Sequence, residues 1–277
     1  MPDEAAPPRH RREPFDRTSE TARAGDRSWD EGTYRRRILV RTDDTTTVGE
    51  LEDDFHHFAI ELEHPDGVIT DVRALAVRHP WDVCASADDP IRAVIGTAVT
   101  DDPSVLGHLE ARHNCTHVFD LAGLAVAHAG RPDVTRCFDA AVTDPDDTGG
   151  RTATLWVDGG LALHWELDQR AVVGPDRWAG IPLWKGFMRW ATTQLDGPTA
   201  EAALVLRRAI DISRGRMDDL DLYRSNTELN HILDGICHAY TPENRDIGVR
   251  ITGSARDFSE RPELLLADFE SRNPTNA

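Results

Sequence analysis

The chain has 277 residues, which is enough for one large domain or two small ones, and we expect one. It carries 31 Lys and Arg against 49 Asp and Glu, a formal net charge of −18, which disfavours a nucleic acid partner because phosphate backbones need clustered cations. No apolar run approaches the ~18 residues of a membrane span, and the N-terminus lacks the apolar core of a secretory signal. These features predict a cytoplasmic protein with no membrane contact, whose four cysteines stay reduced.

The two ends differ in composition from the rest of the chain. Residues 1–33 are rich in Pro, Arg, Asp, Glu and Ser, so they are predicted to form a disordered tail that cannot bury enough apolar surface to order itself. Residues 269–277 are predicted to be a flexible C-terminus. A single α+β domain is expected over residues 34–268.

Alternating apolar side chains predict a three-stranded antiparallel meander between Tyr34 and His79. Ile38 and Val40 share one face of the first strand, and the third strand spans 68–77. The links are expected at residues 42–45 and 64–67. The second strand is predicted to place on one face the residues Asp54, His56, Phe58, Ile60 and Leu62.

Helices and further strands are predicted after the meander. A short helix is expected near Asp82 or Ser86, and a longer one starts behind Asn114 and ends at Gly130. Strands are predicted over 137–142 and 151–167, the latter folded at the hairpin signal Asp158-Gly159. Helices follow over 182–194, 199–214 and 227–233, and strands over 236–240 and 249–252. The fold class is therefore α+β, with mostly antiparallel sheet built from hairpins and a meander and helices packed on one side.

The segment 112–120 carries the candidate catalytic residues. His117 and Asp120 are neighbours at helical spacing, so the carboxylate could orient the imidazole. Cys115 would have a lowered pKa at the start of a helix if it faces solvent, and Arg112 would bind an anionic substrate. The structural alternative is equally open: Cys115 packs as a small apolar side chain, His117 bonds a backbone carbonyl and Asp120 completes a surface ion pair.

A metal site is the second hypothesis for the cysteines. Cys84, Cys115 and His117 would supply three zinc ligands with an open fourth position, although residues so far apart in sequence need not meet. A divalent transition metal such as zinc is therefore a candidate cofactor. The chain shows no NAD, FAD or ATP motif.

Three residues are candidates for substrate binding. Trp81 could form an apolar wall, and Arg208 could hold a carboxylate, although Arg208 also fits a solvated helix face. His56 shares its predicted face with apolar side chains, where an imidazole is commonly a satisfied core group. Asp53 and Asp54, just before it, could act as acid, base or ligand, but acidic residues are frequent in this chain.

Several motifs occur in an order that resembles one bacterial family. They are Leu51-Glu52-Asp53-Asp54-Phe55-His56-His57-Phe58, the Pro80-Trp81 turn before Cys84, Asn114-Cys115-Thr116-His117-Val118-Phe119-Asp120-Leu121, residues 201–209 and residues 253–258. Together they resemble Domain of Unknown Function 2889 over about residues 34–266. The resemblance implies a bacterial cytosolic protein whose family motifs include Cys84, Cys115 and His117, and it brings no reaction or cofactor.

Two functional hypotheses follow. The first is a small-molecule enzyme of the hydrolase or lyase type with a Cys, His and Asp site that could hold a metal. The second is a non-catalytic accessory protein that binds a ligand or docks a subunit, and a protein partner or a homo-oligomer stays open.

Overall fold

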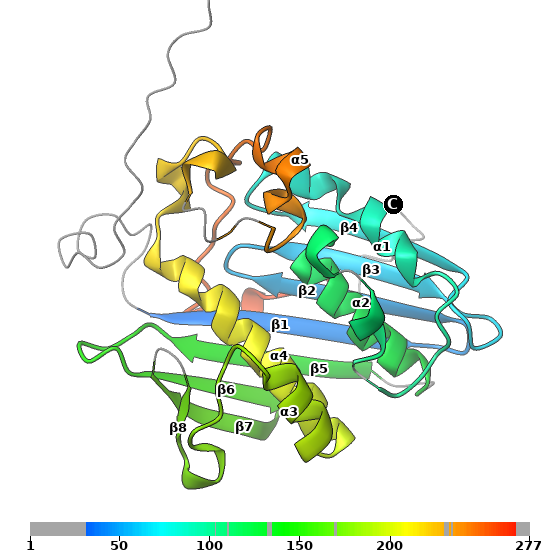
Figure 1. Ribbon diagram of the computed structural model, residues 1–277, viewed down its shortest axis with the longest axis horizontal. Helices are drawn as coiled ribbons and strands as arrows, with labels where there is room; N and C mark the ends of the chain where they lie inside the picture. The colour runs from blue at the N-terminus through cyan, green and yellow to red at the C-terminus, as the bar shows by residue number, and fades with distance from the viewer. Residues whose placement is uncertain are drawn as a thin grey trace, which may run out of the picture.

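The computed structural model describes residues 32–269, apart from 103, 110, 132–134, 169–170, 230–232 and 234. The predictions for the tail up to residue 31 and for residues 270–277 lie outside the described residues. The described strands form one antiparallel sheet in the order β4-β3-β2-β1-β5-β6-β7-β8 (Figure 1). The strand bounds are β1 Thr33–Thr42, β2 Thr46–Asp53, β3 His57–Glu63, β4 Asp71–Arg78, β5 Thr135–Thr143, β6 Arg151–Val157, β7 Gly160–Leu167 and β8 Val172–Gly174.

The helices cover one face of this sheet, with α2 in front of β1, β2 and β3 and α4 crossing β5, β6 and β7 (Figure 1). The α-helix bounds are α1 Asp88–Ile91, α2 Thr116–Ala129, α3 Phe187–Gln194, α4 Gly197–Ser213 and α5 Pro242–Arg245. Asp196 caps α4 by accepting from Thr199 N at 2.9 Å. The predicted α+β class, with helices on one side, is confirmed.

The opposite face of β1 and β2 is covered by the C-terminal segment. Arg37 Nη1 donates to Leu265 O at 3.1 Å, and Leu266 N donates to Glu52 Oε2 at 2.9 Å. Leu266 and Phe269 form a small apolar cluster with Val48. The central strands are therefore buried on both faces, which explains why every residue of β2 after Thr46 is buried although several are polar.

The prediction of one strand through residues 54–62 is wrong, because β2 and β3 are two strands joined by a tight turn. Asp53 N donates to His56 O at 2.8 Å. The Asp53 carboxylate accepts from Phe55 N and His56 N, both at 2.8 Å. An aspartate side chain that bonds the backbone two residues onward favours a turn over extended structure. The meander therefore has four strands.

One of the two predictions between residues 151 and 194 is confirmed and the other changes. The predicted hairpin is confirmed: Asp158 and Gly159 have φ of 51° and 78°, the two positive values of a type I′ turn. The helix predicted from residue 182 begins only at Phe187, because Gly186 before it has a φ of 90°.

The predictions for the last part of the chain are largely wrong. The strands predicted over 236–240 and 249–252 are absent among the described residues. Residues 236–240 contain a 3-10 turn instead. Residues 249–252 make only isolated bridges, to Trp81 and Ser225. Ile247, Val249 and Ile251 are exposed, so their alternation does not mark a buried face. Of the helix predicted at 227–233, residues 230–232 lie outside the described residues, and a 3-10 turn covers Asn226–Glu228.

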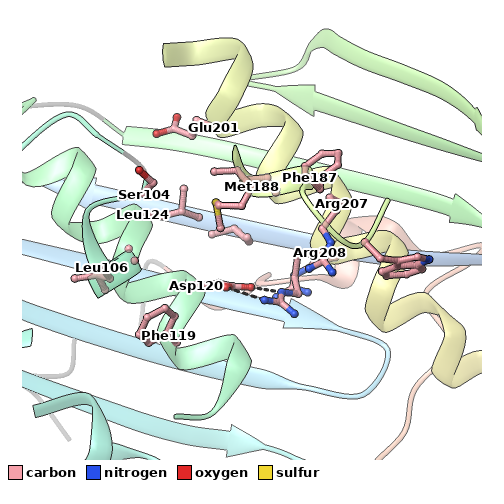
Figure 2. A pocket seen from close by; sticks show the side chains of 17 residues that line it. Ser104, Leu106, Phe119, Asp120, Leu124, Phe187, Met188, Glu201, Arg207 and Arg208 are labelled. Carbon is pink, nitrogen blue, oxygen red and sulfur yellow. Dashed lines mark hydrogen bonds and ion pairs between the residues drawn. The ribbon is translucent and has the colours of Figure 1, made fainter. Parts of the chain in front are cut away.

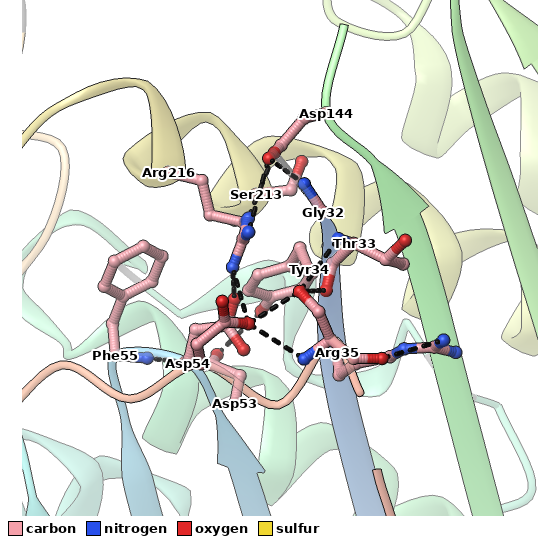
Figure 3. Close-up of polar contacts among 12 residues, drawn as sticks. Gly32, Thr33, Tyr34, Arg35, Asp53, Asp54, Phe55, Asp144, Ser213 and Arg216 are labelled. Atoms are coloured by element: carbon pink, nitrogen blue, oxygen red, sulfur yellow. Dashed lines mark hydrogen bonds and ion pairs between the residues drawn. The ribbon is translucent and has the colours of Figure 1, made fainter. Parts of the chain in front are cut away.

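A buried ion-pair network fixes the turn between β2 and β3 to the rest of the fold (Figure 3). Arg216 donates from Nη1 to Asp54 Oδ2 at 2.8 Å and from Nε to Asp144 Oδ1 at 3.0 Å. Asp144 follows β5, and Arg216 lies in the 3-10 turn after α4. Burial raises the pKa of Asp54 to about 7, although the Arg216 guanidinium opposes this shift.

Replacing Arg216 with Met should destabilise the fold by about 3–5 kcal/mol, because it leaves two buried carboxylates without their cation. Chemical denaturation followed by circular dichroism measures the free energy of unfolding. The control is Arg214→Met, which removes an exposed guanidinium from the Trp184 ring and should cost about 1 kcal/mol or less. Equal losses in both variants would contradict a structural role for the Arg216 network.

Candidate functional site

The turn after β2 places one fully buried carboxylate among several donors. Asp53 Oδ2 accepts from the Tyr34 hydroxyl at 2.8 Å, and Oδ1 lies 3.1 Å from His56 Nδ1. Arg36 Nη1 lies 3.8 Å from Oδ2. Burial alone would favour the neutral acid, but His56, Arg36 and His117 outweigh it and hold the pKa of Asp53 well below its usual range. Asp53 is therefore ionised at neutral pH.

The first turn of α2 brings His117 against this carboxylate. Its ring stacks on the ring of His56 with centroids 3.7 Å apart, and its Nε2 lies 3.8 Å from Asp53 Oδ2. Nε2 has no hydrogen-bond partner among the described residues, while Nδ1 lies 3.9 Å from Cys115 Sγ. Burial lowers the pKa of His56. The pKa of His117 is lowered well below its usual value by burial and by the neighbouring His56 and Arg36. Both imidazoles are therefore neutral at neutral pH.

The contact with Asp53 sets the tautomer of His56. An ionised carboxylate only accepts hydrogen bonds, so we assign the proton of His56 to Nδ1, which leaves the lone pair on Nε2. The side chain is 13% exposed and lines a cavity. This arrangement of carboxylate, Nδ1–H and free Nε2 is the one that orients a histidine as a base or as a metal ligand.

A cavity of about 250 Å³ opens beside the two imidazoles. Its wall combines the β2–β3 turn, the start of α2, the end of α4 and, from the chain after α4, residues that include Leu220, Leu229 and Tyr240. Trp81 Nε1 donates to the Tyr240 hydroxyl at 3.1 Å, which fixes two aromatic walls. The larger apolar and aromatic side chains of the lining are Phe55, Trp81, Ile212, Leu220, Leu229, Leu233, Ile236 and Tyr240.

The structure places six of the eight residues named from the sequence in this cavity lining. They are His56, Trp81, Cys84, Cys115, His117 and Arg208. Arg112 is exposed and is not among the residues that line this cavity, so its expected role as an anion clamp stays a prediction. Asp120 accepts from Arg208 at 2.5 and 3.2 Å. The carboxylate beside His117 is that of Asp53, from a distant part of the sequence.

The thiols do not have the acidity that an exposed helix start would give them. Cys115 is buried, and burial raises its pKa to about 12. Burial also raises the pKa of the Cys84 and Cys237 thiols, which line the same cavity. All three are therefore protonated at neutral pH, and they form part of the cavity wall.

The metal-ligand geometry also differs from the expected set. Among the described residues, the group of at least three His, Cys, Asp or Glu whose ligand atoms all lie within 4.8 Å of one another is Asp53, His56 and His117. Cys84, Cys115 and His117 do not form such a group. Carboxylate and imidazole ligands together suit zinc and other divalent transition metals.

Two contributors to this site were missed in the sequence. Tyr34, Arg36 and Ile38 share the buried, helix-facing side of β1. A charged side chain among apolar ones on this face could have identified Arg36 as part of a site. Asp53 was considered, but many acidic residues in the chain made it hard to single out. Its carboxylate bonds the backbone two and three residues onward, at Phe55 and His56, which is the spacing of an aspartate turn. His57 lies on the opposite face, where it contacts Glu50 and Glu52.

Residues 32–129 match the sequence profile of the family described as protein of unknown function DUF2889, which confirms the resemblance over this part of the chain. No curated protein matches the chain. The matched range contains Asp53, His56 and His117, whereas Arg208 and Tyr240 of the cavity lie outside it. Among the described residues, no helix combines the length and the apolar character that crossing a membrane requires.

The buried His117 should make stability depend on pH. Its pKa is lowered in the folded protein, so below about pH 6.5 the unfolded chain takes up a proton that the folded chain does not. The free energy of unfolding of the wild type, relative to that of His117→Gln, should therefore fall as the pH decreases from 7 to 5. Denaturation curves at several pH values measure it. His164→Gln, at an exposed site on β7, is the control and should follow the wild type; parallel curves for His117→Gln would contradict the prediction.

Proposed function

We propose that this protein is a small-molecule enzyme of the hydrolase or lyase type, in which His56 is the general base and Asp53 orients it. The observation that carries the proposal is the contact of His56 Nδ1 with a buried, ionised carboxylate at 3.1 Å, with the ring of the same histidine in the wall of an apolar cavity. The lowered pKa of His56 supports it, because a base must be unprotonated at working pH. A bacterial, cytosolic location is part of the same proposal.

In this mechanism, His56 Nε2 accepts one proton and Asp53 stabilises the imidazolium that forms. If the proton comes from water, the hydroxide formed attacks a carbonyl carbon, the bond from that carbon to the leaving group breaks, and the imidazolium returns its proton to the leaving group; the enzyme is then a hydrolase. If the proton comes from a carbon next to a carbonyl, a double bond forms to the neighbouring carbon as its leaving group departs, and the imidazolium gives its proton to that group; the enzyme is then a lyase. His117 stacks on His56 and is neutral, so it adds no charge against the imidazolium.

The cavity indicates the substrate class. Trp81 and Tyr240 offer aromatic walls to an apolar or aromatic body, and the thiols add soft apolar surface. Arg208 lines the same space, where it could attract an anionic substituent, although it is shared with Asp120 and Asp211. We therefore propose an apolar carbonyl compound as the substrate.

A divalent metal held by Asp53, His56 and His117 is the second candidate. It is favoured by the spacing of the three ligand atoms, by the neutral state of both imidazoles and by the unpartnered Nε2 of His117. Three protein ligands leave an open position for water or substrate, the arrangement of catalytic zinc sites. The metal would then activate the water, and Tyr34 would orient the Asp53 carboxylate from behind.

The test of catalysis is a turnover screen with aryl esters, lactones and β-hydroxycarbonyl compounds. For any compound that is turned over, His56→Gln and Asp53→Asn should each lower kcat by about 10²–10⁴-fold, because the first removes the base and the second removes the acceptor that orients it. His164→Gln should leave kcat unchanged. Tight binding of a compound without turnover would favour the non-catalytic ligand-binding alternative, and unchanged turnover in His56→Gln would exclude His56 as the general base.

Titration of the metal-free protein with zinc chloride by isothermal calorimetry separates the two mechanisms. The metal mechanism requires one equivalent to bind in the wild type and binding to be at least ten-fold weaker in His117→Ala. It also requires EDTA to abolish turnover. The metal-free mechanism requires turnover to persist in EDTA with no saturable zinc binding at micromolar concentrations.

A further inference from the structure

A second cavity, of about 260 Å³, lies between α2 and α4 (Figure 2). It is separate from the cavity beside His56, although Arg208 contributes to both linings. Figure 2 shows Met188 and Leu124 facing each other across this space, with the Asp120–Arg208 pair at one end. Its apolar lining includes Ile38, Leu106, Leu124, Phe187, Met188 and Val205.

Arg36 on β1 lines this apolar cavity and is almost completely buried, with 1% of its surface exposed. None of its three guanidinium nitrogens has a hydrogen-bond partner among the described residues. Its nearest charge partner is Asp53, at 3.8 Å, too long for a hydrogen bond. A buried guanidinium with unsatisfied donors is costly, so its retention points to a ligand that completes it.

The other charged groups of the lining already have partners. Asp120 and Arg208 bond each other, and Arg207 Nε donates to Leu183 O at 3.0 Å. Glu201 Oε2 accepts no hydrogen bond among the described residues, but it has two charge partners: it lies 3.3 Å from His128 Nε2 and 3.6 Å from Arg131 Nη1. Arg36 is therefore the group in this lining whose charge and donors are least satisfied.

We propose that this cavity binds a small monocarboxylate with an apolar body, and that Arg36 holds its carboxylate. The planar guanidinium matches a carboxylate with two parallel N–H···O bonds. One cation with unsatisfied donors suits one negative charge, whereas a phosphate dianion would need further unpaired cations to offset its desolvation. The aliphatic and aromatic lining accepts the apolar body. Arg36 takes no part in the proposed proton transfer at His56, so the two proposals are tested separately.

Titration of the full chain with sodium octanoate tests the proposal, with octanamide as the neutral probe of the same shape. We expect saturable octanoate binding by calorimetry and at least ten-fold weaker binding of octanamide. Arg36→Met should weaken octanoate binding at least ten-fold, because it removes the cation that holds the carboxylate. A purely structural Arg36 would instead leave octanoate binding unchanged on replacement.

Two control variants locate the binding. Arg37→Met removes a neighbouring arginine that faces the other side of β1 and pairs with Asp139, and it should keep the wild-type octanoate affinity. His56→Gln should also keep it, which distinguishes this site from the cavity of the proposed enzyme. Leu204→Trp fills the second cavity without touching Arg36 and should abolish binding, so it carries the test if Arg36→Met does not fold.

Any one of three results would overturn the proposal: no saturable octanoate binding to the wild type at millimolar concentrations, equal affinity for octanamide, or unchanged octanoate affinity in Leu204→Trp.

Discussion

The candidate site depends on the buried carboxylate of Asp53 being ionised. As an acceptor it closes the turn between β2 and β3 through two backbone N–H groups, and it holds the Tyr34 hydroxyl and the His56 ring. A protonated Asp53 would lose much of its capacity to accept these bonds. The same charge therefore determines where β3 begins and how the imidazole is presented to the cavity, so fold and chemistry share one constraint.

The neighbouring carboxylates Asp53 and Asp54 show how the environment separates two identical groups. Asp53 accepts from several donors, which lower its pKa despite burial, whereas burial outweighs the help of Arg216 and raises the pKa of Asp54 to about 7. Pairs of titratable groups with pKa values driven apart are typical of sites that manage protons. Here the two carboxylates serve different structures: Asp53 organises the imidazoles, and Asp54 ties the same turn to α4 and β5 through Arg216.

Local patterns predicted what depends on local interactions. The alternation in β1, the helical stripe of α2 and the Asp158-Gly159 turn need only neighbours in sequence, and each was recognised. The partners of His117 and Asp120 could not be predicted in this way. They come from Asp53 at the end of β2 and from Arg208 on α4, and pairings across such distances depend on how α2 and α4 pack on the sheet. The cysteines illustrate the same limit, because the sequence left open whether Cys115 faces solvent or packs as a small apolar side chain, and its burial depends on the surrounding segments.

Arg36 connects the two cavities electrostatically. It lines the cavity between α2 and α4, and it also helps to lower the pKa of Asp53, of His56 and of His117. A carboxylate bound to its guanidinium would neutralise part of that charge, and the distance of 3.8 Å to Asp53 is short enough for the change to be felt through a medium of low dielectric constant. Loss of positive potential at the imidazoles makes their protonation easier. Arg36 is therefore the group through which a charge in the second cavity would be felt at the imidazoles.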